Sequence, residues 1–277
     1  MGDQQFIPNI PKKEQERIVI VGSGFAGLKL LQRLKGKGFQ IVMLDRNNFH
    51  QFQPLLYQVA TAGLEPSAIS FPIRKIIQGE KDVHFRIAEL LEIKVDEKII
   101  SSTAGAIRYD HLVLATGAST NFFNKPNIER NTLSMKTASD AIHIRNTILE
   151  NFENALLETD LQNTDQFLNL VLVGGGATGV ELAGALAEMK KYIFPKEYPE
   201  LDLTKMRIVV YEAGERLLSG MSLKASAKAL KYLHQLGVEV RLNTFVNDYD
   251  GKLLTIASGE SIASQTVELN LPTVGRF

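Results

Sequence analysis

The chain has 277 residues, 44% of them hydrophobic and 22% charged, which is typical of a globular protein with about two domains. Lysine plus arginine and aspartate plus glutamate number 31 each, so no overall field attracts a nucleic acid or an anionic membrane surface, and no nucleic-acid partner is expected. The absence of cysteine excludes disulfides, thiolate metal sites and electron transfer through a redox-active cysteine pair.

The N-terminal residues 1–16 mix polar and proline-containing segments and lack the apolar run of a signal peptide, so they predict a flexible arm. No stretch of about 18 uninterrupted apolar residues occurs, which argues against a helix that spans a membrane. These two observations together favour a cytoplasmic location.

A first dinucleotide-binding motif follows the arm. A β-branched run at residues 17–21 predicts a strand, and leucines at helical spacing predict a helix over 28–35. The next strand, residues 40–44, ends at Asp45, which lies roughly 20 residues after Gly22, as in the dinucleotide-binding fingerprint.

The turn between this first strand and helix has glycines where a pyrophosphate site needs them. Gly22 permits a tight turn, Gly24 lets the backbone approach the pyrophosphate, and Gly27 allows close packing of helix on strand. Asp45 is placed to accept hydrogen bonds from a ribose diol. The cofactor-binding residues predicted here are Gly22, Gly24, Phe25, Ala26, Gly27 and Asp45.

The same order of features returns about 150 residues later. A strand at 169–173 precedes a second glycine turn and a helix over 180–190, and a strand at 207–211 ends at Glu212. An acid there would bind the adenosine ribose and repel the 2′-phosphate of NADPH, so we expect a preference for NADH. The predicted cofactor-binding residues are Gly174, Gly176, Ala177, Thr178, Gly179 and Glu212.

Two dinucleotide sites in one chain indicate electron transfer between two cofactors, and FAD with NADH is the simplest pair. The first site is the expected FAD site because its unit continues through a candidate third strand at 83–89. A later strand within 110–118 ends in Ala115, Thr116 and Gly117, which resemble the short ATG motif of two-dinucleotide-binding flavoproteins. We include these three residues among the predicted cofactor contacts.

The expected fold class is α/β, with two Rossmann-like three-layer (ββα) dinucleotide-binding domains. We predict an FAD-binding domain over 17–120 and an NADH-binding domain over 121–267. The second contains helices over 136–157 and 222–236, a strand over 238–242 and a hairpin over 245–256. Histidines 50, 84, 111, 143 and 234 form no ligand-spaced pair, so structural roles are expected and no metal site is predicted.

The segment from Asn48 to Ala60, read with both glycine turns, Ala115-Thr116-Gly117 and residues 179–184, resembles type II NADH:quinone oxidoreductases over residues 17–265. The resemblance implies an enzyme that oxidises NADH through FAD and reduces a quinone without pumping protons. It also implies attachment to a membrane surface, peripherally on the inner face of the cell membrane in the full-length protein. A homodimer is a further expectation.

The resemblance implies a role for Glu181 beside the nicotinamide and the flavin, which makes it the candidate catalytic residue. The alternative is an acid of the first helical turn that stabilises the helix dipole. Gln53 and Pro54 are candidates for contact near the flavin. Arg46 either flanks the adenosine or is solvated.

The C-terminal residues 268–277 depart from this family and are expected to form an atypical tail. Family members continue with a strand, a Gly-Asp motif that holds the flavin, and helices for quinone access and membrane attachment, so the C-terminal part of the FAD domain is expected to be missing. Alternatives therefore stay open: a truncated inactive nucleotide-binding fragment, a redox-sensing module, or a flavoenzyme like apoptosis-inducing factor or a ferredoxin reductase.

Overall fold

The computed structural model describes residues 5–122, 124–270 and 273–275. Contacts divide the described residues into two compact units. The first unit is assigned Met1–Phe52, Ser70–Ser119 and Gly275–Phe277, and the second is assigned Gln53–Ile69 and Thr120–Val274.

A four-stranded parallel sheet forms the centre of the first unit. Its strands, in spatial order, are β5 (Val83–Ile87), β2 (Gln40–Asp45), β1 (Arg17–Val21) and β9 (His111–Leu114). Because β1 lies in the middle, the turn that follows it opens at the carboxyl edge between β2 and β9, where parallel sheets bind ligands.

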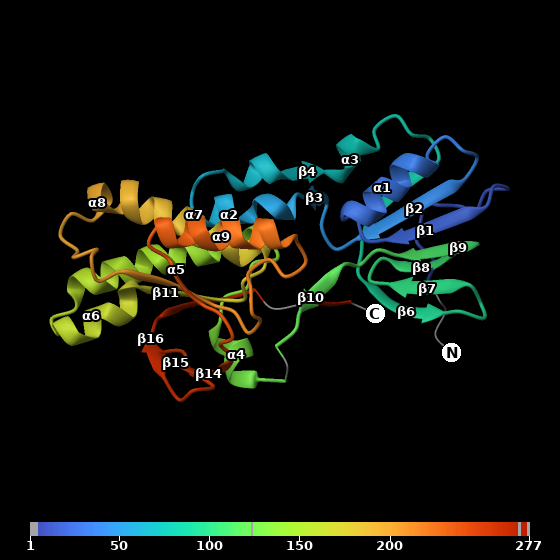
Figure 1. Ribbon diagram of the computed structural model, residues 1–277. Helices are drawn as coiled ribbons and strands as arrows, with labels where there is room; N and C mark the ends of the chain where they lie inside the picture. The colour runs from blue at the N-terminus through green and yellow to red at the C-terminus, as the bar shows by residue number, and fades with distance from the viewer. Residues whose placement is uncertain (1–4, 123, 271–272, 276–277) are drawn as a thin grey trace. The chain divides into compact units, whose positions relative to one another are not determined.

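The sheet of the first unit is covered on both faces. On one face lie α1 (Phe25–Leu34) and α3 (Ile73–Ile76), and on the other the antiparallel strands β6 (Leu90–Lys94), β7 (Ile99–Ser102) and β8 (Gly105–Arg108) (Figure 1). Side chains of β1 alternate between the two cores: Ile18 and Ile20 pack with the helices, whereas Val19 and Val21 pack with β6 to β8. Burial on both faces explains the uninterrupted apolar run of β1.

The N-terminal segment is held against the first unit from residue 5 onward. Ile7 and Ile10 are buried in the core on the β6 to β8 side, and the N–H of Ile7 donates to the carbonyl of Ala106 at 2.9 Å. The guanidinium of Arg17 donates to the carbonyl of Ile10 at 3.0 Å. Residues 5–16 therefore differ from the flexible arm that composition predicts, because two isoleucines reach the core; residues 1–4 lie outside the described range.

The second unit repeats this arrangement. Its parallel strands, in the same relative order, are β13 (Glu239–Arg241), β12 (Arg207–Tyr211), β11 (Asn169–Val173) and β17 (Thr266–Leu269). One face packs against α2 (Leu56–Ala60), α5 (Ala138–Leu157) and α7 (Ala177–Tyr192). The other face packs against the antiparallel strands β14 (Val246–Tyr249), β15 (Leu253–Ile256) and β16 (Ser261–Ala263) (Figure 1).

Residues 53–69 belong to the second unit by contact, although the sequence places them in the FAD-binding domain. Leu56 and Val59 of α2 are buried with Ile144 and Ile148 of α5 in one core. The remaining residues of this segment form η1 (Gln53–Leu55) and η2 (Pro66–Ile69). Sequence order suggested the first domain, and tertiary packing assigns the segment to the second.

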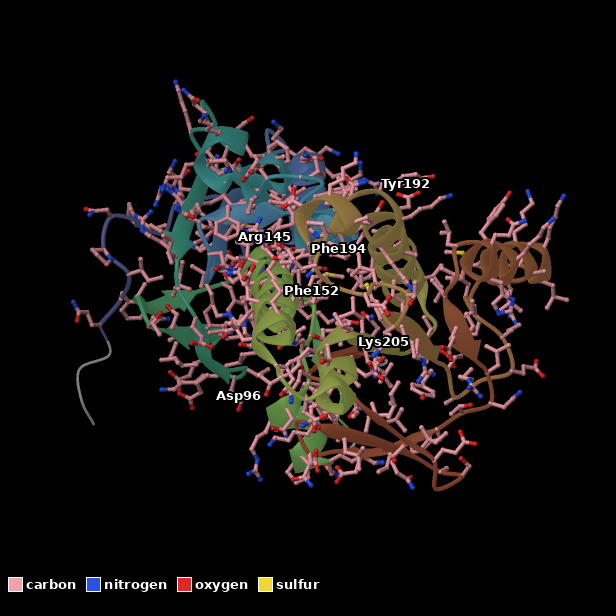
Figure 2. All side chains as sticks on the ribbon, turned by 90° about the vertical axis from the view of Figure 1, so that its left-hand side faces the viewer. Asp96, Arg145, Phe152, Tyr192, Phe194 and Lys205 are labelled. Atoms are coloured by element: carbon pink, nitrogen blue, oxygen red, sulfur yellow. The ribbon has the colours of Figure 1, made fainter. Side chains whose placement is uncertain are left out.

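The other elements complete the two units. They are β3 (Phe49–Gln51), β4 (Ser70–Pro72), β10 (Ala118–Thr120), α4 (Pro126–Asn131), α6 (Leu161–Leu168), α8 (Phe194–Glu197), α9 (Leu223–Gln235) and β18 (Thr273–Gly275). Phe194 of α8 packs against Phe152 of α5, with ring centroids 4.7 Å apart and the rings at 80° (Figure 2).

The predicted α/β class with two three-layer units is confirmed. The predicted strands at 17–21, 169–173 and 207–211 have the observed bounds. Both glycine-turn helices begin three residues earlier than predicted, at Phe25 and Ala177, because each turn leads directly into its helix. Within the described residues, no helix combines the length and apolar character needed to cross a membrane.

β17 carries a buried acid that the sequence places in an atypical tail. Glu268 is 2% exposed; its Oε2 accepts from the side-chain amide of Asn270, and its Oε1 finds no hydrogen-bond partner among the described residues. Burial raises the pKa of Glu268 well above its ordinary value, and the positive charge of Lys136 opposes this shift. Residues 268 and 269 complete the strand; residues 271, 272, 276 and 277 of the predicted tail lie outside the described residues.

Glu268→Gln is expected to flatten the pH dependence of stability. Because the folded-state pKa is raised, the folded chain keeps a proton that the unfolded chain releases, so stability falls as pH rises above the ordinary glutamate range, until the folded pKa is passed. Glutamine has no such proton. Between pH 4 and pH 9, the unfolding temperature of the variant should rise relative to that of the parent by several degrees. A difference in unfolding temperature that does not change with pH would contradict this prediction.

Candidate functional site

The first glycine turn, residues 22–27, joins β1 to α1 within the first unit. Gly22 has φ +106°, and its N–H donates to the carbonyl of Leu44 at 2.7 Å. A Cβ at Gly22 would overlap the carbonyl of Ala115, and one at Gly27 would overlap the carbonyl of Gly22. Both positions therefore need glycine for internal packing.

Gly24 differs from its neighbours because no protein atom lies within 4 Å of the place its Cβ would occupy. It is the N-cap of α1, and neither a side-chain cap nor an acid is present in the first turn of that helix. The N–H groups of a helix N-terminus favour anions. This combination of open space and uncapped helix fits a phosphate group of a dinucleotide.

The second turn, residues 174–179, repeats these features in the second unit. Gly174 has φ +110°, and a Cβ there would overlap the carbonyl of Asn270, while one at Gly179 would overlap the carbonyl of Gly174. Gly176 faces open space and begins α7 without a side-chain cap. Asn270 follows β17 as Ala115 follows β9, so both turns are closed by the residue after the fourth strand.

The acid of the first unit is tied to its turn. Oδ2 of Asp45 accepts from the N–H of Ser23 at 2.6 Å and from its hydroxyl at 2.8 Å, and Oδ1 accepts from the N–H of Asn47 at 2.8 Å. A carboxylate offers about four acceptor positions, so it retains capacity for a ribose hydroxyl.

The acid of the second unit is held in a matching way. Oε2 of Glu212 accepts from the N–H of Gly175 at 2.6 Å, and Oε1 accepts from the N–H of Gly214 at 2.6 Å. The structure therefore brings each predicted acid to its own predicted turn.

His50 lies beside the first turn, a position that the sequence did not indicate. Its Nδ1 lies 3.0 Å from the carbonyl of Ser23, so Nδ1 carries the proton and donates. The ring of Phe25 contacts His50 at 5.1 Å and Phe52 at 5.4 Å between centroids, and Phe25 is 49% exposed. An aromatic cluster thus borders the first turn. Spacing gave no signal for it, because His50 and Ser23 are 27 residues apart.

Glu181 lies on the second turn of α7, and its surroundings alter its acidity. Reduced hydration from neighbouring atoms raises the pKa of its carboxyl, although Glu181 is an exposed residue. The positive end of the α7 dipole acts in the opposite direction. Glu181 therefore keeps its proton to higher pH than an ordinary glutamate.

Two residues predicted to contact FAD have polar partners within their own units. Nη1 of Arg46 lies 3.7 Å from Oε1 of Glu89, and both side chains are exposed. Gln53 belongs to the second unit and donates from Nε2 to the carbonyl of Lys136 at 3.1 Å. Among the described residues, no group of three or more histidines, aspartates or glutamates is arranged to hold a metal ion.

Two parallel sheets, each with a glycine turn and an acid hydrogen-bonded to that turn, are the arrangement found in two-dinucleotide oxidoreductases. The family described as pyridine nucleotide-disulphide oxidoreductase matches residues 16–269, and the chain belongs to this family. The redox-active cysteine pair used by disulphide reductases is excluded in this sequence, since it contains no cysteine.

Among curated relatives, the chain is 32% identical over 257 residues to the type II NADH:quinone oxidoreductase Ndh of Mycobacterium tuberculosis, covering 91% of this chain and 56% of that protein. It is 30% identical over 251 residues to the external alternative NAD(P)H-ubiquinone oxidoreductase B2, mitochondrial, of Arabidopsis thaliana. This match covers 86% of this chain and 43% of that protein. The chain spans about half the length of these relatives.

Solved structures share the fold. NDH2 from Plasmodium falciparum in complex with NADH matches with a TM-score of 0.87 at 23% identity, covering 95% of this chain and 56% of that one. The sulfide:quinone oxidoreductase from Aquifex aeolicus matches with a TM-score of 0.76 at 16% identity, covering 94% of this chain and 59% of that one.

Proposed function

We propose that this chain is the nucleotide-binding part of a non-proton-pumping NADH:quinone oxidoreductase that binds FAD at the first turn and NADH at the second. The observation that carries the proposal is the repetition, in one chain, of a turn with an open central glycine and an acid fixed beside it. Names of the relatives support the choice of NADH as donor and a quinone as acceptor.

In this proposal the glycines of each turn have two different roles. Gly22, Gly27, Gly174 and Gly179 shape the turns, whereas Gly24 and Gly176 leave room for the pyrophosphate. Asp45 and Glu212 bind the adenosine riboses, and bound FAD supplies the capacity to accept a hydride and release electrons singly or in pairs. The other proposed FAD contacts are Phe25, Ala26, Ala115, Thr116 and Gly117, and the other NADH contacts are Ala177 and Thr178.

The predicted contacts of Arg46 and Gln53 with FAD stay predictions, as do attachment of the whole protein to the inner face of the cell membrane and dimer formation. The sequence similarity to type II NADH:quinone oxidoreductases supports the membrane prediction. Binding of the chain to phospholipid vesicles, measured by co-sedimentation, tests it directly.

A second candidate is a nucleotide-binding fragment without turnover, because the chain matches 56% of the mycobacterial relative's length. The two candidates differ in colour and in reaction. Purified chain supplemented with FAD and freed of excess should retain the visible absorbance of oxidised flavin and oxidise NADH in the presence of a short-chain quinone. A colourless protein that still binds NADH would favour the fragment and overturn the enzyme.

NADH is expected to be a better donor than NADPH. The carboxylate of Glu212 is fixed by the N–H groups of Gly175 and Gly214 at the end of β12, where the 2′-phosphate of NADPH would meet its negative charge. Measured kcat/KM should favour NADH by at least about tenfold, or about 1.4 kcal/mol. Glu212→Gln should narrow the preference, and equal kcat/KM values in the parent chain would contradict this prediction.

A further inference from the structure

The residue that follows the first glycine is held alike in the two turns, but by different groups. In the first turn both the N–H and the hydroxyl of Ser23 donate to one oxygen of Asp45. In the second turn Gly175 donates to Glu212 through its N–H alone. A shorter acid is thus paired with a residue that has a side chain, and a longer acid with a residue that has none.

Space explains this pairing in the second turn. A Cβ at Gly175 would lie 3.0 Å from Oε2 of Glu212 and 3.2 Å from its Cβ, and it would overlap a methyl group of Leu217. The methyl group of Leu217 and the side chain of Glu212 therefore together occupy room that a serine side chain would need. In the first turn Ser23 is 2% exposed, so its side chain fills the corresponding room beside Asp45.

The carbonyl of the same residue is also fixed in both turns. His50 donates from Nδ1 to the carbonyl of Ser23 at 3.0 Å, and the N–H of Leu218 donates to the carbonyl of Gly175 at 2.8 Å. The N–H and the carbonyl of this residue belong to the two peptide groups on either side of it, so rotation of either peptide breaks a hydrogen bond. Asp45 and Glu212 are therefore each hydrogen-bonded to a backbone position that is itself fixed, next to Gly24 and Gly176.

We propose that Ser23 and Gly175 are positioning residues for the ribose-binding acids, and that Ser23–Asp45 and Gly175–Glu212 are interchangeable as pairs but not as single residues. The inference rests on the proposed function, in which each acid binds the ribose of a dinucleotide. The match in length sets how far the carboxylate stands from the turn, and hence the distance between the ribose and pyrophosphate positions.

The test is a double-mutant cycle in the first turn, made in the whole chain with S23G, D45E and S23G/D45E. FAD affinity is measured by adding FAD to the flavin-free proteins and following its fluorescence. S23G alone should weaken binding about threefold because a donor is lost, and D45E alone at least about tenfold because the longer acid meets the serine side chain. The double variant should return to within about threefold of the parent.

The decisive result is that the effect of S23G on FAD affinity reverses when the acid at position 45 is changed. S23G should weaken FAD binding beside Asp45 and strengthen it beside a glutamate at position 45, which loss of stability alone would not produce. Further weakening in the double variant would overturn the proposal. The urea midpoints of the four flavin-free proteins should show the same reversal. If the parent chain bound no FAD, the proposed function would fail, while these midpoints would still decide whether the residues form a matched pair.

Discussion

Gly176→Ala is expected to weaken nucleotide binding at the second turn by at least about tenfold, about 1.4 kcal/mol, while the unfolding temperature stays unchanged. No protein atom lies within 4 Å of the added methyl group, so it creates no internal clash. It does project into the space that the pyrophosphate would occupy at the start of α7. Titration with NAD⁺ measures the loss, and Gly24→Ala should have the same effect on FAD.

Gly174→Ala is the matched control, two residues away. Gly174 has φ +110°, and its added methyl would overlap the carbonyl of Asn270, so the change should destabilise the fold by about 2 kcal/mol or more. Thermal unfolding of both variants separates the two roles. Equal losses of stability in G174A and G176A would contradict the assignment of Gly176 to ligand approach.

Glu181→Gln is expected to lower quinone-dependent NADH oxidation about 100-fold, within the range for loss of a general acid or base. Reduction of a quinone to a quinol consumes two protons, and partial desolvation raises the pKa of Glu181, which is the direction that favours a proton donor. The glutamine keeps the shape of the side chain without this proton. Glu188→Gln, two turns further from the glycine turn on the same helix, is the control and should retain activity.

The pH profile gives an independent check on Glu181. If the protonated form of Glu181 supplies the proton, activity should fall as pH rises through its raised pKa. This decrease of activity on the alkaline side of the profile, the alkaline limb, should be absent in the glutamine variant. Unchanged turnover in the variant, or an unchanged alkaline limb, would leave Glu181 as a helix-terminal acid.

Sequence predicted the parallel sheets and both turns because their constraints are local. A strand buried on both faces is mostly apolar, as β1 and β11 are after their first residues, Arg17 and Asn169. Each turn needs glycine at positions where a Cβ would overlap a carbonyl. The acids were predictable for a related reason, since Asp45 and Glu212 end the strands next to the turns.

The rest depends on contacts between distant residues. Nothing in the segment from Gln53 to Ile69 indicates that Val59 packs beside Ile148, so its assignment to the second unit required the tertiary structure. Composition likewise predicted a flexible arm, because residues 1–16 mix polar residues and prolines and the burial of Ile7 and Ile10 depends on β7 and β8. His50 was read as structural, and its bond to Ser23 appears only when β3 lies beside the turn.

Binding stoichiometry tests the central claim most directly. The flavin-free chain is titrated calorimetrically with FAD, and the FAD-saturated chain is then titrated with NAD⁺. One equivalent of each should bind without displacement, with G24A weakening the first event and G176A the second. A single equivalent in total, or displacement of FAD by NAD⁺, would contradict two separate dinucleotide sites.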